Sequence, residues 1–172
     1  LLVICTGKMT KQIDNFQGQI KTYTGTFVLG STTPSYDLET AINKEFATSH
    51  ITAELIHQTA KKFIGEIDQF PPVFSALKKD GKRLYEFARA GESVKISSRK
   101  VTIKEFKITK IEGLNVNFSV TCSKGTYIRS LAYDFGKALN SGAHLSALRR
   151  TKIGDFSVEN AISIDKFISD LS

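Results

Sequence analysis

The alternation of hydrophobic and polar positions along the chain predicts a mixture of strands and amphipathic helices. Strand segments are rich in β-branched and aromatic residues, whereas helix segments place their apolar residues three and four positions apart. By these criteria we expect strands over residues 21–30, 101–113, 114–124 and 144–154. We expect helices over residues 52–63, 81–90, 128–139 and 163–171.

Caps, breakers and turns mark several of these boundaries. Thr52 and Ser163 are typical N-cap residues. Pro71-Pro72 excludes regular structure around it, because proline lacks an amide hydrogen and restricts the residue before it. Glu112-Gly113 provides the turn of an antiparallel hairpin. Because hairpin spacing dominates over strand–helix–strand spacing, we expect one α+β domain with a mixed, mostly antiparallel sheet and flanking helices.

The composition is that of a globular protein with a single core. The 172 residues are 41% hydrophobic. The opening apolar run LLVIC, which we expect to form an exposed strand, is too short to span a bilayer and lacks the flanks of a signal peptide. Cys5 and Cys122 form neither a disulfide framework nor a zinc-ligand pattern. We therefore expect a reduced, cytoplasmic protein without a metal and without a membrane partner.

Positive charge is concentrated between Lys78 and Lys110. This segment holds eleven basic and four acidic residues, which accounts for the whole net charge of +7. Clustered cations near aromatic side chains suit a phosphate backbone, because binding releases condensed counterions. They equally suit a solvated face with lysine-rich strand edges, so composition leaves nucleic acid as one of two alternatives.

Residues 122–130, CSKGTYIRS, combine a thiol, a glycine turn, a tyrosine and an arginine. The order Lys124-Gly125-Thr126 does not match the G-x-x-x-x-G-K-[ST] loop that binds phosphate. A cysteine nucleophile needs an imidazole base, and although His144 could approach Cys122, nothing in the sequence fixes that geometry. Cys122 occupies an inward-facing strand position, where a cysteine usually serves as a small apolar side chain.

Tyr127 and Arg129 leave a strand end just before the helix expected over 128–139. An arginine at such a corner can pair with a carboxylate and hold it ionised, and a tyrosine beside it can stack on a planar base or move a proton. A surface arginine beside a half-buried tyrosine is the alternative that these two residues alone leave open.

Four stretches, which run in order through nearly the whole chain, share long motifs with one known family. They are KTYTGTFVLGSTTPSYDLE (21–39), FPPVFSALKKDGKRLYEFARAG (70–91), CSKGTYIRSLAYDFG (122–136) and GAHLSALRRTKIGDFSVENAI (142–162). With these motifs the chain closely resembles the bacterial tRNA pseudouridine synthase B family. The resemblance implies a mixed sheet with an RNA-gripping thumb, here about 71–100. It also implies a cofactor-free isomerisation of uridine 55 in the T-arm of tRNA.

The resemblance also implies roles for individual residues. Tyr23 matches the tyrosine that stacks against the flipped uracil, and Leu148 matches the leucine that contacts the base. Tyr127 matches the tyrosine under the target nucleotide, and Arg129 the arginine that pairs with the catalytic aspartate. The cations expected to contact tRNA phosphates are Lys78, Lys79, Lys82, Arg83, Arg89, Arg149 and Arg150.

One motif of the family is absent from this sequence. The family's catalytic aspartate lies in G-x-L-D-P, which ends a short distance before the residues that match LLVICTGKMT, and none of the eight aspartates present has that context. We therefore expect an inactive catalytic domain without its N-terminal part, in which Arg129 has no catalytic carboxylate to orient. The intact enzyme would be a monomer. A non-catalytic tRNA-binding module and a hydrolase that uses Cys122 stay open as alternatives.

Overall fold

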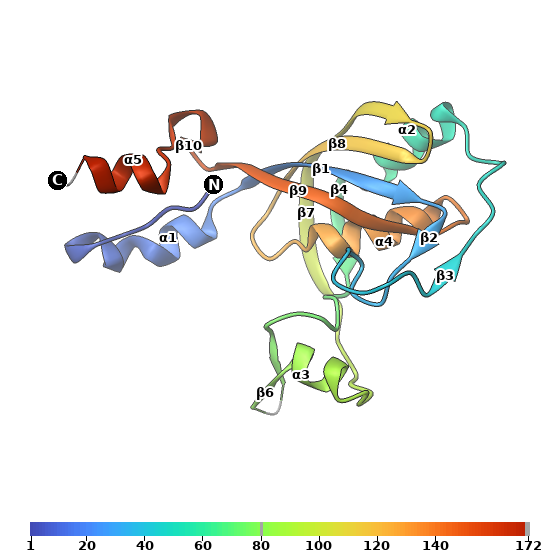
Figure 1. Cartoon of the computed structure of the whole chain (residues 1–172), viewed down its shortest axis with the longest axis horizontal. Helices are drawn as coiled ribbons and strands as arrows, with labels where there is room; N and C mark the ends of the chain where they lie inside the picture. The colour runs from blue at the N-terminus through green and yellow to red at the C-terminus, as the bar shows by residue number, and fades with distance from the viewer. Residues whose placement is uncertain (80, 171–172) are drawn as a thin grey trace.

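The computed structural model describes residues 1–79 and 81–170 and centres on a six-stranded sheet (Figure 1). Its strand order is β10-β9-β1-β8-β7-β4, and all neighbouring pairs are antiparallel. The six strands are β1 (Lys21–Leu29), β4 (Gly65–Gln69), β7 (Arg99–Glu112), β8 (Asn115–Cys122), β9 (Ala143–Ile153) and β10 (Phe156–Ser157). Two ribbons pair β2 (Ser31–Thr32) with β3 (Lys44–Glu45), and β5 (Lys78–Lys79) with β6 (Lys82–Arg83). The expected α+β class is confirmed.

The helices begin largely where the caps predict. They are η1 (Gly7–Gln12), α1 (Ile13–Gly18), α2 (Ala53–Lys62), α3 (Leu84–Arg89), α4 (Ile128–Ala138), η2 (Val158–Asn160) and α5 (Ile164–Ser169). The side chain of Thr52 accepts a hydrogen bond from the Leu55 amide, and that of Ser163 accepts one from the Lys166 amide. The expected end of the last helix at residue 171 lies outside the described residues. Within the described ranges, no helix has the length and apolarity needed to cross a membrane.

Two local expectations were wrong, and one strand was not predicted. Residues 1–6 form no strand, because they contact β9 through Leu1 and Arg150 rather than through a ladder of backbone hydrogen bonds. β4 was not predicted, since its sequence GEIDQ offers one apolar residue and alternates exposed with less exposed positions at the sheet edge. The helix expected over 81–90 is shorter, because Lys82–Arg83 pairs with β5 before α3 begins.

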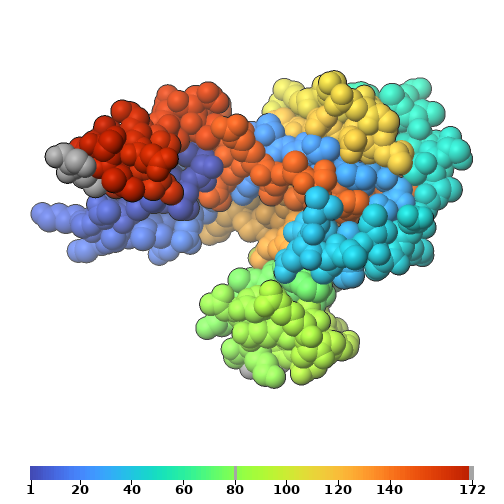
Figure 2. Space-filling view, in the orientation of Figure 1, coloured from blue at the N-terminus to red at the C-terminus, as the bar shows by residue number. Residues whose placement is uncertain are grey.

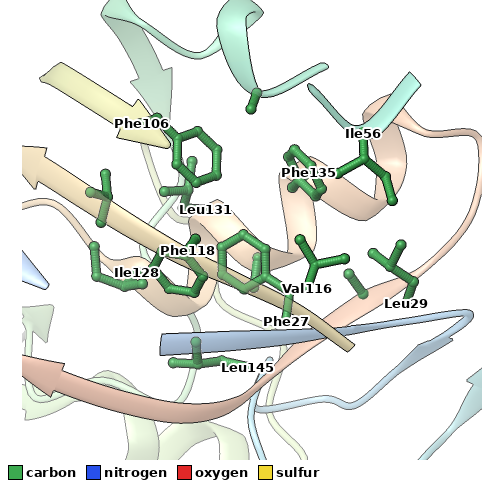
Figure 3. Packing of buried hydrophobic residues seen from close by; sticks show 14 of the residues in the cluster. Phe27, Leu29, Ile56, Phe106, Val116, Phe118, Ile128, Leu131, Phe135 and Leu145 are labelled. Atoms are coloured by element: carbon green, nitrogen blue, oxygen red, sulfur yellow. The ribbon is translucent and has the colours of Figure 1, made fainter. Parts of the chain in front are cut away.

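The hydrophobic core lies between one face of the sheet and the helices α2 and α4 (Figure 3). Phenylalanine rings from both layers meet there. The rings of Phe27 and Phe118 lie 4.1 Å apart, and those of Phe106 and Phe135 lie 5.7 Å apart. Ile128 and the other apolar residues of α4 bury one side of that helix, as their spacing predicts.

The opposite face of the sheet is polar. Threonine hydroxyls on β1 hydrogen bond to side chains of β8, Thr22 with Thr121 at 3.1 Å and Thr26 with Asn117 at 2.7 Å. These cross-strand bonds satisfy polar groups on a face that carries no apolar layer. The sheet therefore has its core on one side only, which is typical of antiparallel sheets.

Between β4 and β7 the chain leaves the sheet and forms a separate lobe (Figures 1 and 2). Residues 70–98 make up this excursion, which contains β5, β6 and α3. We refer to residues 70–98 as the thumb lobe. Its bounds lie close to the expected thumb segment of about 71–100, except that Arg99 and Lys100 already belong to β7.

The pairing of β9 with β1 is irregular at two points. Phe27 lies opposite Leu145, Gly25 opposite Leu148, and Tyr23 opposite Arg150. The register shifts between Thr26 and Phe27 and again between Thr22 and Tyr23, so that β9 carries one extra residue at each shift.

Gly136 in α4 packs directly against the turn before β9. A Cβ at this position would collide with the backbone N of Ala143 and the backbone C of Gly142. We expect Gly136→Ala to lower the free energy of unfolding by about 1–3 kcal/mol, although alanine is the better helix former by about 1 kcal/mol. Urea denaturation would measure the change. Gly18→Ala in α1, where nothing lies within 4 Å of an added Cβ, is the control and should not destabilise. An unchanged stability of Gly136→Ala would contradict this packing.

Asp134 in α4 should make stability depend on pH. Burial raises the pKa of its carboxyl to about 6, with Lys137 opposing the shift. Because the folded state binds this proton more tightly, the contribution to stability is complete below pH ~4 and is lost as the pH rises through ~6. We expect Asp134→Asn to gain about 1–2 kcal/mol relative to the parent between pH 4 and 7, allowing for partial exposure. Denaturation of both proteins at pH 4 and pH 7 would measure this gain. The same dependence of stability on pH in the variant and the parent would refute it.

Candidate active site

Tyr127 and Arg129 lie at the start of α4, directly after the end of β8. A turn over residues 123–126 joins the two elements, with Gly125 at a φ of +81° and the Thr126 hydroxyl donating to the Ser123 carbonyl at 2.9 Å. Ile128, between the two candidates, is buried in the core. Since neighbouring positions on a helix point in different directions, burying Ile128 leaves Tyr127 and Arg129 at the margin of the core.

Arg129 connects three segments of the chain. Its Nη1 donates to Asp37 Oδ2 at 3.1 Å and to the Ser35 carbonyl at 3.4 Å, while Nη2 donates to the Phe74 carbonyl at 2.8 Å. The side chain is 22% exposed, and that of Asp37 is 25% exposed. A guanidinium in this arrangement is held in one orientation by its planar set of donors.

Beside Arg129 is a cavity of about 340 Å³. Its lining includes Glu39, Tyr85 and Arg89, the last two from the thumb lobe. Glu39 lies 4.0 Å from Arg129 and 3.7 Å from Arg89, so both arginines face an acidic loop. The cavity is therefore bounded by α4, the loop after β2 and the thumb lobe.

Asp37 was not identified as a site residue from the sequence. It lies 92 positions from Arg129, in a loop whose composition predicts only a turn. Within this chain Arg129 therefore pairs with a carboxylate other than the absent G-x-L-D-P aspartate, namely that of Asp37. A partly buried arginine calls for an acidic partner, but no local pattern around Arg129 says which residue supplies it.

Tyr127 is held through its backbone and its ring. The Gln69 side chain hydrogen bonds to both the amide and the carbonyl of Tyr127, and the Arg99 guanidinium lies 4.7 Å from the ring centroid. Neither Gln69 nor Arg99 was predicted to belong to the site.

Tyr23, Leu148 and Arg150 share one face of β1 and β9, the face that α4 covers. Tyr23 packs against the core cluster, whereas Leu148 is 46% exposed. Burial raises the pKa of Tyr23, and a hydrogen bond with Arg150 opposes that shift. Arg150 Nε and Nη2 donate to the Leu1 carbonyl at 2.9 and 2.8 Å, so the start of the chain lies beside this group.

The expected RNA-contacting cations do not form one cluster. Arg149 pairs with Thr24 and therefore belongs to the polar face of the sheet, opposite to Arg150. Arg89 lines the cavity next to Arg129. The remaining cations lie in the thumb lobe, on or beside its ribbon: Lys78, Lys79, Lys82 and Arg83.

The alternative of a cysteine hydrolase finds no geometric support. Cys122 pairs with Lys21 at one end of β1, whereas His144 pairs with Val28 at the other end. Cys122 is buried, and burial raises the pKa of its thiol. Among residues 1–79 and 81–170, no group of three or more His, Cys, Asp and Glu side chains is arranged to hold a metal ion.

Comparisons with known proteins identify the family of this chain. Residues 1–128 match the family model for the TruB family pseudouridylate synthase (N terminal domain), and residues 129–171 match that for the tRNA pseudouridylate synthase B C-terminal domain. The boundary between the two matches falls at the start of α4, and β9 from the second match pairs with β1 from the first. The chain belongs to the TruB family of pseudouridylate synthases.

Individual relatives cover nearly the whole chain. The tRNA pseudouridine synthase B of Flavobacterium johnsoniae is 67% identical over 171 residues, which are 99% of this chain and 75% of that protein. The tRNA pseudouridine synthase B of Phocaeicola vulgatus is 49% identical over 167 residues, 97% of this chain and 71% of that protein.

Solved structures share the fold at lower identity. A chain of a Cbf5-Nop10-Gar1 complex superposes with a TM-score of 0.69 at 28% identity, covering 96% of this chain and 40% of that one. A chain of an H/ACA RNP bound to a substrate RNA containing 2′-deoxyuridine gives 0.66 at 26% identity, with 96% and 38% covered. This chain thus spans about two fifths of the length of these solved relatives.

The Arg129 contacts should control local opening of two segments, the loop that contains Asp37 and the first residues of the thumb lobe. Lysine at position 129 keeps the charge but cannot reach Asp37 and the Phe74 carbonyl with a planar fork. We expect Arg129→Lys to speed amide hydrogen exchange within residues 35–40 and 74–76 on the order of tenfold, measured by mass spectrometry. Arg149→Lys, on the polar face of the sheet, is the matched control and should leave these peptides unchanged. Equal exchange in the two variants would contradict a joining role for Arg129.

Proposed function

We propose that the intact protein isomerises uridine to pseudouridine at position 55 in the T-arm of tRNA, without a cofactor. In this proposal residues 1–172 form most of a single catalytic domain, and the thumb segment of about 71–100 grips the RNA. The observation that carries the proposal is the partly buried Arg129, fixed by three acceptors at the start of α4, on the side of the sheet that also presents Tyr23 and Leu148. Family membership supports it.

The reaction needs binding and orientation more than reactive side chains from this chain. The N1–C1′ bond of the uridine breaks, the uracil turns, and a C5–C1′ bond forms; C5 loses a proton and N1 gains one, so atoms balance. Tyr23 and Tyr127 would hold the planar base by stacking, and Leu148 would pack against it. Arg129 would orient the catalytic carboxylate by charge-assisted hydrogen bonds.

The catalytic carboxylate itself would come from a G-x-L-D-P motif on a segment before Leu1. The Leu1 carbonyl is bound by Arg150, which also neighbours Tyr23, so a preceding segment would enter the site next to the base platform. On this proposal the 172-residue chain is inactive by itself. Asp37 would help to hold Arg129 in place through its bond to Nη1.

The partner would be the T-arm stem-loop, bound by the intact enzyme as a monomer. The cations proposed to contact its phosphates are Lys78, Lys79, Lys82, Arg83, Arg89, Arg149 and Arg150. The affinity should fall with added salt, and the fall should be steeper the more phosphates these cations neutralise.

Arg129→Ala tests the assignment in the full-length enzyme. The catalytic carboxylate would lose its arginine partner. We therefore expect turnover to fall about a hundredfold or more, while the affinity for a T-arm stem-loop changes about threefold at most. Tritium release from uridine labelled at C5 would measure turnover. Lys61→Ala, an exposed charge change in α2, is the control.

Full turnover by Arg129→Ala would refute the role of this residue. A full-length protein that binds the stem-loop but forms no pseudouridine would instead indicate the non-catalytic tRNA-binding module. Failure of both binding and turnover would refute tRNA as the partner.

A further inference from the structure

The two attachment points of the thumb lobe form a cross-strand pair. Gln69 is the last residue of β4 and Arg99 is the first residue of β7, and the two are register partners in the sheet. The chain leaves for the thumb lobe after the first and returns at the second (Figure 1). Both side chains contact Tyr127, which belongs to neither strand.

Gln69 fixes the backbone of Tyr127. Its side chain is fully buried, its Oε1 accepts from the Tyr127 amide at 2.8 Å, and its Nε2 donates to the Tyr127 carbonyl at 3.0 Å. A buried primary amide that lost these partners would carry an unpaired donor and acceptor, which is costly. Two bonds to one residue also fix its direction as well as its position.

Arg99 fixes the ring of Tyr127. The guanidinium carbon lies 4.7 Å from the ring centroid, within the range of a cation–π contact. Its Nε is buried and has no hydrogen-bond partner among the described residues. Gly125 also lies near this group, since an added Cβ would lie 3.6 Å from the guanidinium carbon.

We propose that Gln69 and Arg99 are positioning residues for Tyr127. Through them, the attachment points of the thumb lobe determine the position and orientation of Tyr127. The effect on turnover rests on the proposed function, whereas the effect on the ring does not. Two further contacts join the same stretch to α4: the Ser130 hydroxyl donates to the Phe70 carbonyl at 2.7 Å, and Arg129 Nη2 donates to the Phe74 carbonyl. A thumb lobe that shifts on gripping RNA therefore moves against the residues that hold the base.

The first test observes the ring directly in the 172-residue chain. Tyrosines are replaced by 3-fluorotyrosine, and the fluorine resonance of Tyr127 is assigned by its loss in Tyr127→Phe. We expect Gln69→Leu and Arg99→Lys each to shift or broaden this resonance and to leave that of Tyr133 unchanged. Gln58→Leu, an exposed amide in α2, and Arg149→Lys are the matched controls. An unshifted Tyr127 resonance in both Gln69→Leu and Arg99→Lys would overturn the proposal.

The second test separates positioning from binding in the full-length enzyme. Under single-turnover conditions we expect Gln69→Leu and Arg99→Lys to slow the formation of pseudouridine about tenfold, with the Kd for a T-arm stem-loop within about threefold. Gln69→Glu keeps the acceptor for the Tyr127 amide and should recover part of the rate. Loss of affinity with an unchanged rate would show that these residues serve RNA binding only, and would overturn the positioning role.

The two tests fail independently. If the unmodified enzyme forms no pseudouridine, the proposed function is wrong and the fluorine resonance alone decides the positioning of Tyr127. If Gln69→Leu does not fold, Arg99→Lys decides, because Arg99 is only partly buried and its replacement keeps the charge.

Discussion

The burial of one side of α4 against the sheet is the constraint on which the candidate site depends. Phe135 and Leu131 are completely buried among residues of β1, β7 and β8, and this contact fixes both the axis and the rotation of the helix. Once the rotation is fixed, the first turn can place its polar residues in only one way. The position of Arg129 is therefore a consequence of apolar packing several residues further along the same helix.

Placing polar groups at the margin of a core creates a need for partners. The Arg129 guanidinium, the Ser130 hydroxyl and the Tyr127 backbone all meet acceptors or donors from residues 35–37 and 69–74. Each such bond compensates a group that would otherwise be desolvated without a partner. The loop after β2 and the root of the thumb lobe are thus ordered by the same helix start that they help to hold.

Much of the framework could be predicted from the sequence, because its signals are local. The hairpin of β7 and β8, the caps Thr52 and Ser163, and the apolar spacing of α4 are each encoded within a few residues. β4 and α1 were missed because their sequences are short and mostly polar, so that their structure comes from pairing and packing with distant segments.

The candidate site divides in the same way. Tyr127 and Arg129 stand out in a long motif, whereas Asp37 and Gln69 reach them across 92 and 58 positions and look like ordinary loop and strand residues. The assignment of Tyr23, Leu148 and Arg150 to one face needs the pairing of β1 with β9, which no local pattern contains. Long-range pairing of this kind is what a single sequence does not reveal.

The two register shifts in β9 have a consequence for which side chains the strand presents. Each extra residue reverses the alternation of faces, so Ser146 reverses it once and Thr151 reverses it back. Outside the shifts, odd-numbered residues such as Leu145 and Ile153 face the core side of the sheet. Between the shifts, from Ala147 to Arg150, the even-numbered residues face that side instead. The middle of β9 is thus a segment of reversed alternation within a core strand. The ends of the strand pack in the core, whereas its middle places Leu148 and Arg150 on the same face as Tyr23.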